Sequence, residues 1–326
     1  MDEPNNTNPS LQNNNNTNNP INDVNARHDV IKEKQKKYHG KYFVIIILIT
    51  LSIEYYIFVF HMCLGNINNV PFTFLIVILI LFHICISMMM WAYYTVMKTS
   101  PGEIPLYWGF YIGDDDYKRK RYCLICNAFK PERCHHCSVC NVCILNMDHH
   151  CPWVDNCIGF YNRKFFMILL FYVSCTLIFY DFSAFYFVFL YIRDFFNLGT
   201  EYTHKGRTVF VVIGYLFILI LSFLLLPFYK FHLTLVLNNS TTIESLEKEH
   251  AAENLKYRLT YSENWRQVFG FNKLLWFFPL VLESGRPDGD GLNWRTVPIM
   301  GEPNNEPPQQ AEMENYNSDQ PLGPKN

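Results

Sequence analysis

Four long hydrophobic stretches limit what this 326-residue chain can fold into. Each is longer than the ~20 residues with which an α-helix crosses about 30 Å of hydrocarbon. Helices in the core of a soluble protein are rarely apolar on every face over such a length. We therefore expect an all-α, polytopic membrane protein whose four transmembrane helices lie within Tyr42–Leu64, Phe72–Met97, Phe165–Ile192 and Thr208–Phe231.

The composition and the polar residues inside these stretches fit a membrane location. Charged residues make up 17% of the chain, whereas about 25% is usual in soluble domains. The net charge of −2 lacks the basic excess of proteins whose main partner is nucleic acid. Glu54, His83 and Asp181 lie inside the stretches, where ionisable groups are costly. We expect Glu54 and His83 to form a structural polar pair rather than a transporter's proton path.

The lysine and arginine residues outside the stretches predict the orientation of the chain. Five lysines between Lys32 and Lys41 precede the first stretch, the loop Gly65–Pro71 carries no charge, and the run Lys118–Arg121 follows the second stretch. Positively charged residues favour the cytosolic side of a membrane. This pattern places both termini and residues 98–164 in the cytosol, and we expect the membrane to be that of the Golgi or the endoplasmic reticulum.

The remaining segments differ in composition. The tails 1–41 and 284–326 are expected to be disordered, because they are rich in asparagine or proline and lack a hydrophobic pattern. The aromatic residues 264–280 are too short to span and should lie at the membrane surface, packed on the cytosolic lobe. The predicted organisation between the tails is transmembrane residues 42–97, a cytosolic cysteine-rich lobe 98–164, transmembrane residues 165–231 and a cytosolic segment 232–283.

An internal repeat organises the cysteine-rich lobe. The pattern Cys-x2-Cys-x9-His-x6-Cys occurs twice, starting at Cys123 and again at Cys137, and the second copy begins before the first one ends. Cytosolic thiols stay reduced, and three thiolates with one imidazole make a closed tetrahedral zinc site. Two structural zinc ions would thus hold together a lobe too small for a large core. The first set is Cys123, Cys126, His136 or its neighbour His135, and Cys143; the second is Cys137, Cys140, His150 or its neighbour His149, and Cys157.

Cys151 is left over by this repeat. It lies one full repeat after Cys137, but valine at position 154 leaves it without a partner for a third set. Asp148 and His149 precede it, so a nucleophile, a base and an orienting carboxylate lie close together in the sequence. A non-catalytic membrane adaptor would explain the zinc repeat but not this additional group.

The run Asp148-His149-His150-Cys151, between the second and third of four hydrophobic stretches, resembles the DHHC family of protein S-acyltransferases. The resemblance extends over about residues 42–280 and is most specific in residues 151–160. It implies that His150 and His136 bind zinc, that His149 is the base and that Cys151 is the nucleophile. The family's Asp-Pro-Gly motif is matched only in part, by Ser100-Pro101-Gly102.

The segment after the fourth stretch carries a second motif of this family. Thr241-Thr242-Ile243-Glu244 matches its Thr-Thr-x-Glu motif, and the same residues form a capping box at the start of a helix expected over 241–259. The resemblance suggests that one of these threonines also braces Asp148.

The resemblance implies that the chain moves a long-chain acyl group, such as palmitoyl, from acyl-CoA to cysteine thiols of membrane-associated proteins. The acyl group would pass through an S-acyl intermediate on Cys151, with zinc only structural. Trp153 should meet the reacting carbonyl end, and one wall of the acyl pocket is predicted at Tyr172, Cys175, Thr176 and Phe179. Residues predicted to meet the phosphates of CoA are Lys130, Arg133, His135, Arg163 and Lys164.

Overall fold

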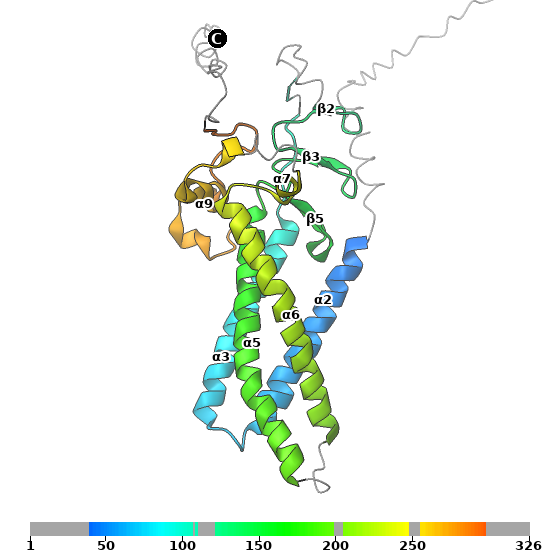
Figure 1. Ribbon diagram of the computed structural model, residues 1–326, viewed down its shortest axis with the longest axis vertical. Coiled ribbons are helices and arrows are strands. Elements are labelled where there is room, and N and C mark those ends of the chain that lie inside the picture. The colour runs from blue at the N-terminus through cyan, green and yellow to red at the C-terminus, as the bar shows by residue number, and fades with distance from the viewer. Residues whose placement is uncertain (1–38, 107, 110–120, 199–204, 248–254, 298–326) are drawn as a thin grey trace, which may run out of the picture.

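The computed structural model describes residues 39–106, 108–109, 121–198, 205–247 and 255–297, so most of both predicted tails lies outside it. Four of its helices are long and apolar enough to cross a membrane, which confirms the predicted membrane fold. They form an elongated bundle with the cysteine-rich lobe at one end (Figure 1). The helices are α2 (His39–Tyr56, continued by π-helical η1, Ile57–Cys63, and the 3-10 turn η2, Leu64–Asn66), α3 (Phe72–Lys98), α5 (Arg163–Leu198) and α6 (Lys205–Leu237).

The helices α5 and α6 are longer than their hydrophobic stretches. The 36 residues of α5 correspond to about 54 Å at 1.5 Å per residue, more than the ~30 Å of a hydrocarbon core. The start of α5, where Arg163 and Lys164 precede the stretch, and the last turns of α6, where six residues follow it, reach the lobe (Figure 1). Polar residues on these turns can therefore take part in the cytosolic site.

The core of the bundle lies where η1 packs against α3, α5 and α6. Phe58 of η1 is fully buried between the rings of Phe82 and Tyr180. The predicted pair of Glu54 and His83 is wrong. The hydroxyl of Tyr180 donates to Glu54 at 3.0 Å, whereas His83 contacts the hydroxyl of Tyr55 at 2.9 Å. Glu54 is bonded to α5, whereas His83 of α3 is bonded to Tyr55, the residue next to Glu54.

The described part of the lobe consists of three antiparallel hairpins, each with its own two-stranded sheet. The residues at their turns, Asn127, Asn141 and Asp155, occupy equivalent positions of the repeat and all have φ near +50°. Asparagine and aspartate tolerate this left-handed conformation better than other residues with a side chain. The sequence repeat is thus a structural repeat. The hairpins are β1–β2 (Tyr122–Cys123, Ala128–Phe129), β3–β4 (His135–Cys137, Val142–Ile144) and β5–β6 (His149–Cys151, Asn156–Ile158).

Hairpin β5–β6 fastens the lobe to the end of α3. The side-chain amide of Asn156 donates to the carbonyls of Val96 at 3.1 Å and Thr99 at 2.9 Å. The amide of Asn162 also donates to the carbonyl of Thr99, at 3.4 Å. Helix ends leave carbonyl groups without partners, and here the lobe supplies donors for them. These bonds fix the position of hairpin β5–β6 relative to the end of α3.

The C-terminal segment covers the end of the bundle and part of the lobe. The helix predicted after Thr241 ends early, because α7 has only five residues and residues 248–254 lie outside the described part. The predicted surface segment packs on α5, since the hydroxyl of Tyr172 donates to the carbonyl of Phe277 at 3.0 Å. The elements of this segment are α7 (Thr242–Leu246), η6 (Leu255–Tyr257), α9 (Tyr261–Phe269), η7 (Lys273–Trp276) and η8 (Glu283–Gly285).

The prediction of disorder from residue 284 onward does not hold for residues 284–297. Lys164 donates to the carbonyl of Gly285 at 2.8 Å. Trp294 makes an edge-to-face contact with Phe160 of the lobe, with ring centroids 5.8 Å apart. These contacts hold the segment as a strap between the lobe and α5.

Candidate active site

The two predicted ligand sets come together in the structure. In each set, three cysteine sulfurs and one histidine nitrogen lie within 4.8 Å of one another. His136 Nδ1 lies 3.3–3.9 Å from the sulfurs of its set. Sulfur and nitrogen ligands of tetrahedral zinc lie about 3.6 Å apart, so both sets fit such an ion. The sets are Cys123, Cys126, His136, Cys143 and Cys137, Cys140, His150, Cys157.

Strand β5 separates the second ligand set from the predicted catalytic group. Successive side chains of a strand point to opposite faces, so His149 and Cys151 share one face while His150 between them faces the other. His150 Nδ1 lies 3.4 Å from Cys140 Sγ. One short strand therefore presents a metal ligand on one side and a base with a thiol on the other.

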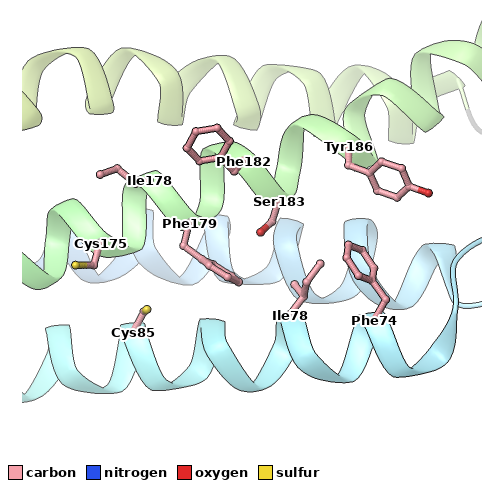
Figure 2. Close-up of a pocket in the computed structure, with 9 residues that line it drawn as sticks. All are labelled: Phe74, Ile78, Cys85, Cys175, Ile178, Phe179, Phe182, Ser183 and Tyr186. Carbon is pink, nitrogen blue, oxygen red and sulfur yellow. The ribbon is translucent and has the colours of Figure 1, made fainter.

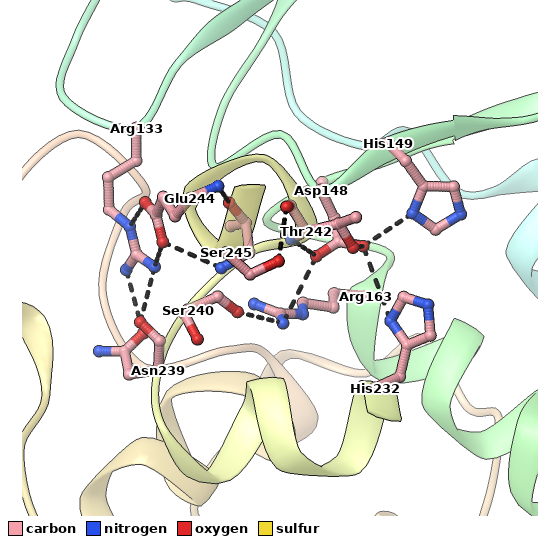
Figure 3. Close-up of polar contacts among 12 residues, drawn as sticks. Arg133, Asp148, His149, Arg163, His232, Asn239, Ser240, Thr242, Glu244 and Ser245 are labelled. Atoms are coloured by element: carbon pink, nitrogen blue, oxygen red, sulfur yellow. Dashed lines mark hydrogen bonds and ion pairs between the residues drawn. The ribbon is translucent and has the colours of Figure 1, made fainter. Parts of the chain in front are cut away.

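The carboxylate of Asp148 is held by two donors of Thr242 and by Arg163, and it holds His149 in turn. Its Oδ2 atom lies 2.7 Å from His149 Nδ1 and accepts from the hydroxyl of Thr242 at 2.9 Å. Its Oδ1 atom accepts from the backbone N–H of Thr242 at 2.9 Å, and Arg163 Nη2 is 3.5 Å away. Figure 3 shows these contacts converging on one buried carboxylate. The orientation of His149 is thereby fixed.

The electrostatics of the site favour a protonated His149. Burial alone would lower the pKa of His149, but the hydrogen bonds to Asp148 and Cys151 outweigh it and raise the pKa to about 9. Burial would raise the pKa of Asp148, but the Arg163 guanidinium and the bond to His149 hold it below its usual value. A cysteine beside a protonated histidine is more readily a thiolate. The arrangement therefore places a protonated imidazole beside a thiol that neither ligand set uses.

The Thr-Thr-x-Glu segment links Asp148 to the rest of the lobe. Thr241 and Glu244 form the predicted capping box of α7. Glu244 also receives two hydrogen bonds from Arg133, at 2.6 Å and 2.8 Å. The guanidinium of Arg133 lies between the rings of Tyr257 and Trp294, 4.6 Å and 4.3 Å from their centroids. This buried ion pair fixes α7, and with it Thr242, against the lobe.

Two residues of the site could not be identified from the sequence. Arg163 was assigned to CoA, yet it donates to the carbonyl of Ser240 at 2.6 Å and lies beside Asp148. His232, in the last turns of α6, has its Nδ1 atom 3.7 Å from Asp148 Oδ2. The only sequence signal for His232 was a polar residue directly after the fourth hydrophobic stretch, and that signal does not point to a partner.

Comparison with known proteins agrees with this geometry. The family model of the DHHC palmitoyltransferase matches residues 116–249. Palmitoyltransferase ZDHHC20 of Homo sapiens is 31% identical over 303 residues, covering 81% of this chain and 77% of the relative. The chain belongs to the DHHC palmitoyltransferase family. Palmitoyltransferase ZDHHC2 of Rattus norvegicus is 30% identical over 297 residues, covering 80% and 76%. Probable protein S-acyltransferase 14 of Arabidopsis thaliana is 31% identical over 248 residues, covering 68% and 78%.

Membership of the DHHC palmitoyltransferase family confirms the resemblance, the enzyme class and the palmitoyl-transfer function predicted from the sequence. The adaptor alternative has no support left, because these relatives are named as transferases. Within this palmitoyltransferase, the two Cys/His sets could each hold a metal ion.

Three of the five residues assigned to CoA phosphates in this palmitoyltransferase do not fit that role. The charged groups of Arg133, Arg163 and Lys164 are buried and bonded to the protein, so they are not exposed to a polyanionic ligand. We correct their assignment to structural contacts. Lys130 and His135 are partly exposed on the lobe and remain predicted CoA contacts.

Trp153 lies in the 3-10 turn η3 (Pro152–Val154), directly after Cys151. Its backbone carbonyl accepts from the hydroxyl of Tyr93 at 2.7 Å, and its half-exposed ring contacts Phe43 of α2 edge-on. The turn is therefore supported by α2 and α3. This position is compatible with the predicted contact to the reacting carbonyl end.

Only two of the four residues predicted to line the acyl pocket on α5 line the groove shown in Figure 2. Cys175 and Phe179 line this apolar groove of about 560 Å³ between α3 and α5. Tyr172 and Thr176 lie outside its lining, and Thr176 donates to the carbonyl of Tyr172 at 2.7 Å. The groove begins about 18 Å along α5 from Arg163 at 1.5 Å per residue. The wall thus stays a prediction for Tyr172 and Thr176.

Proposed function

We propose that this palmitoyltransferase acts through an S-acyl intermediate on Cys151, with His149 as base and Asp148 as the group that orients it. The observation that supports this most is the placement of His149. Its Nδ1 atom is bonded to a buried carboxylate, and its other side is directed to a thiol that neither ligand set uses.

In the first half-reaction, the Cys151 thiolate attacks the carbonyl carbon of the acyl-CoA thioester. A new carbon–sulfur bond forms at Cys151, and the bond to CoA breaks. The leaving thiolate of CoA takes the proton from His149. Asp148 stabilises the protonated form of His149 before this transfer, since its carboxylate is held by Thr242 and Arg163.

In the second half-reaction, a cysteine of the protein substrate gives its proton to His149 and attacks the acyl group. Cys151 leaves as a thiolate, which restores the starting state. One thioester replaces another in each step, so the transfer needs no other energy source. The substrates we propose are cytosolic cysteines of membrane-associated proteins.

The surroundings of Cys151 suit a long acyl chain. Cys151 is buried in an apolar cluster with Met89 and Tyr93 of α3 and Phe166 and Leu170 of α5. A chain leaving water gains about 0.8 kcal/mol for each CH2 that it buries. We therefore place the acyl tail among the helices and the thioester at the face of the lobe.

We propose two zinc ions per chain, one in each Cys3His set, with a structural role. Each set has four protein donors, and a closed set of this kind leaves no open position for a substrate. What the ions supply is folding free energy for a lobe made of three small separate sheets.

We also propose that both termini and the lobe face the cytosol, in the Golgi or the endoplasmic reticulum. The lysine asymmetry of the sequence supports this orientation. Asn5, Asn15 and Asn238 begin glycosylation sequons that would then stay unmodified. A shift in mobility after deglycosylation, traced to any of the three, would reverse the orientation.

The decisive experiment incubates the purified protein with labelled palmitoyl-CoA and measures acyl label that hydroxylamine removes. Cys151→Ser should abolish this label. Cys85→Ala, a cysteine of α3 outside both ligand sets, is the matched control and should keep it. Full labelling of Cys151→Ser would mean that another residue is the nucleophile.

A further inference from the structure

His232 has no task in the proposed reaction, although it lies against the catalytic group. The residue is 2% exposed, and its ring packs edge-to-face on Phe228 and Phe166, with centroids 4.5 Å and 5.1 Å away. Its centroid is 5.5 Å from that of His149. Two imidazoles thus face one carboxylate oxygen, at 2.7 Å for His149 and 3.7 Å for His232.

These three side chains have the donor types of an open zinc site. One carboxylate oxygen and two imidazole nitrogens lie within 4.8 Å of one another. Two donors bound at ~2.0–2.2 Å to one tetrahedral zinc ion lie about 3.3–3.6 Å apart, so the three side chains would move by up to roughly 1.5 Å to bind one ion together. Two histidines with one carboxylate are a known zinc-binding combination.

We propose that Asp148, His149 and His232 form a third divalent-cation site, and that zinc bound there inhibits acyl transfer. The site is separate from both Cys3His sets, since it uses none of their eight side chains. The inhibition rests on the proposed role of His149 as base, whereas the binding itself does not.

The inhibition follows from the protons of His149. The metal takes the Nδ1 lone pair, so the proton that Nδ1 shares with Asp148 leaves to solvent. The remaining proton of the neutral ring is then on Nε2, and His149 has no lone pair to accept a proton from Cys151 or from a substrate thiol. Loss of a general base slows a reaction by about 10²–10⁴-fold.

The residues around this site determine how a cation can enter it and how tightly it binds zinc. The side chain of His149 is 24% exposed, whereas Asp148 is 1% exposed, so a cation would enter beside His149. Arg163 Nη2, 3.5 Å from Asp148 Oδ1, opposes a second positive charge. With one anionic donor instead of three thiolates, the site should bind zinc more weakly and more reversibly than the Cys3His sets do.

The test uses the full-length protein with zinc in both Cys3His sets. Equilibrium dialysis against buffered free Zn²⁺ should raise the zinc content from two to three per chain, while the initial rate of self-acylation falls at least about 100-fold. His232→Phe keeps an aromatic ring among the neighbouring rings but removes the donor. It should stay at two zinc ions and keep its own zinc-free rate over the same Zn²⁺ range.

Two further variants keep the outcome decisive. His232→Gln replaces His232→Phe if the latter does not fold, and should behave alike. Cys151→Ser should still take up the third zinc ion, which separates binding from the identity of the nucleophile. Equal zinc inhibition of wild type and both His232 variants, or a wild-type content that stays at two, overturns the proposed site. Acylation that persists in Cys151→Ser instead overturns the proposed function and leaves the zinc count as an independent measurement.

Discussion

Hairpins β3–β4 and β5–β6 have the same register, shifted along the chain by one repeat. His135 pairs with Ile144 in the first, and His149 pairs with Ile158 in the second. In each hairpin, the residue after this histidine is a second histidine that belongs to a ligand set: His136 in the first hairpin and His150 in the second. The backbone that presents the proposed base thus exists twice in the lobe.

The two hairpins differ in the residues on either side of these histidines. Asp148 precedes His149, whereas Cys134 precedes His135. Burial lowers the pKa of His135, whereas the bonds to Asp148 and Cys151 raise that of His149 to about 9 despite its burial. The next thiol on the same face of the strand is Cys137, a member of a ligand set, in the first hairpin and the unused Cys151 in the second. The two hairpins thus share one backbone, and we propose that Asp148 and the unused thiol of Cys151 make only the second one catalytic.

Serine substitutions at the equivalent cysteines Cys137 and Cys151 should have the largest effects on zinc content and self-acylation, and the two variants should differ most from each other. Cys151→Ser should keep two zinc ions and lower the self-acylation rate below about one-thousandth of wild type, because the nucleophile is lost. Cys137→Ser should lose zinc and unfold the lobe, because metal binding supplies folding free energy. Zinc content and hydroxylamine-labile label, measured side by side, check both. Loss of zinc from Cys151→Ser would erase the difference between the hairpins.

Alanine substitutions at the two equivalent histidines should also give different rates of self-acylation, but the difference should be smaller than for the two cysteines. His149→Ala should slow self-acylation by about 10²–10⁴-fold with both zinc ions retained, as expected for a general base. His135→Ala should stay within about twofold at saturating acyl-CoA, since it removes no bonded partner of Cys151. Single-turnover rates measure this. Similar losses in both variants would mean that the hairpins share the catalytic task.

Asp148→Asn should move the pH dependence of self-acylation. The carboxylate favours protonated His149, so its removal lowers the pKa of His149 from the value of about 9. The protonated form of His149 is then lost at lower pH. The alkaline limb of the pH–rate profile should shift to lower pH. An unchanged limb would assign it to a group other than His149.

Among the variants of the proposed catalytic group and its support, Thr242→Val should have the smallest effect on the rate of self-acylation. It removes the hydroxyl that donates to Asp148 but keeps the backbone donor. One hydrogen bond to a charged group contributes about 1.5–3 kcal/mol, which corresponds to roughly 10–100-fold in the single-turnover rate. Ser245→Ala is the control, since its exposed hydroxyl donates to a carbonyl of the same helix. Equal rates in both variants would show that the backbone donor alone orients Asp148.

Much of this organisation could be predicted from the sequence, because it depends on length and spacing. Helix length in a bilayer and ligand spacing around a metal are local properties, so the four helices and the six cysteines of the ligand sets followed directly. The choice between the two neighbouring histidines of each set came from the family resemblance. Arg133 and Arg163 were misassigned because their buried acidic partners, Glu244 and Asp148, become neighbours only in the folded chain. A basic residue near an active site looks the same in a sequence whether it binds a ligand or a carboxylate.

The strap of residues 284–297 was missed for a related reason. The segment is polar and rich in glycine and charged residues, which favours disorder. It is held by a few large contacts, such as that of Trp294 with Phe160, and not by a hydrophobic pattern. Likewise, the similar positions of Glu54 and His83 along their hydrophobic stretches suggested that the two residues pair. In the structure Glu54 instead bonds to Tyr180 of α5, because the orientation of each helix about its axis cannot be read from the stretches.

The interleaving of the two ligand sets has a consequence for biosynthesis. Cys143, which completes the first set, is translated one repeat earlier than Cys157, which completes the second. At about 5–20 residues per second, the interval is on the order of one second. During this time Cys137 and Cys140 are available to a zinc ion already held by Cys123 and Cys126, and four thiolates also form a stable tetrahedral set. We therefore expect a nascent chain that captures zinc in this way to exchange ligands once Cys157 has been translated.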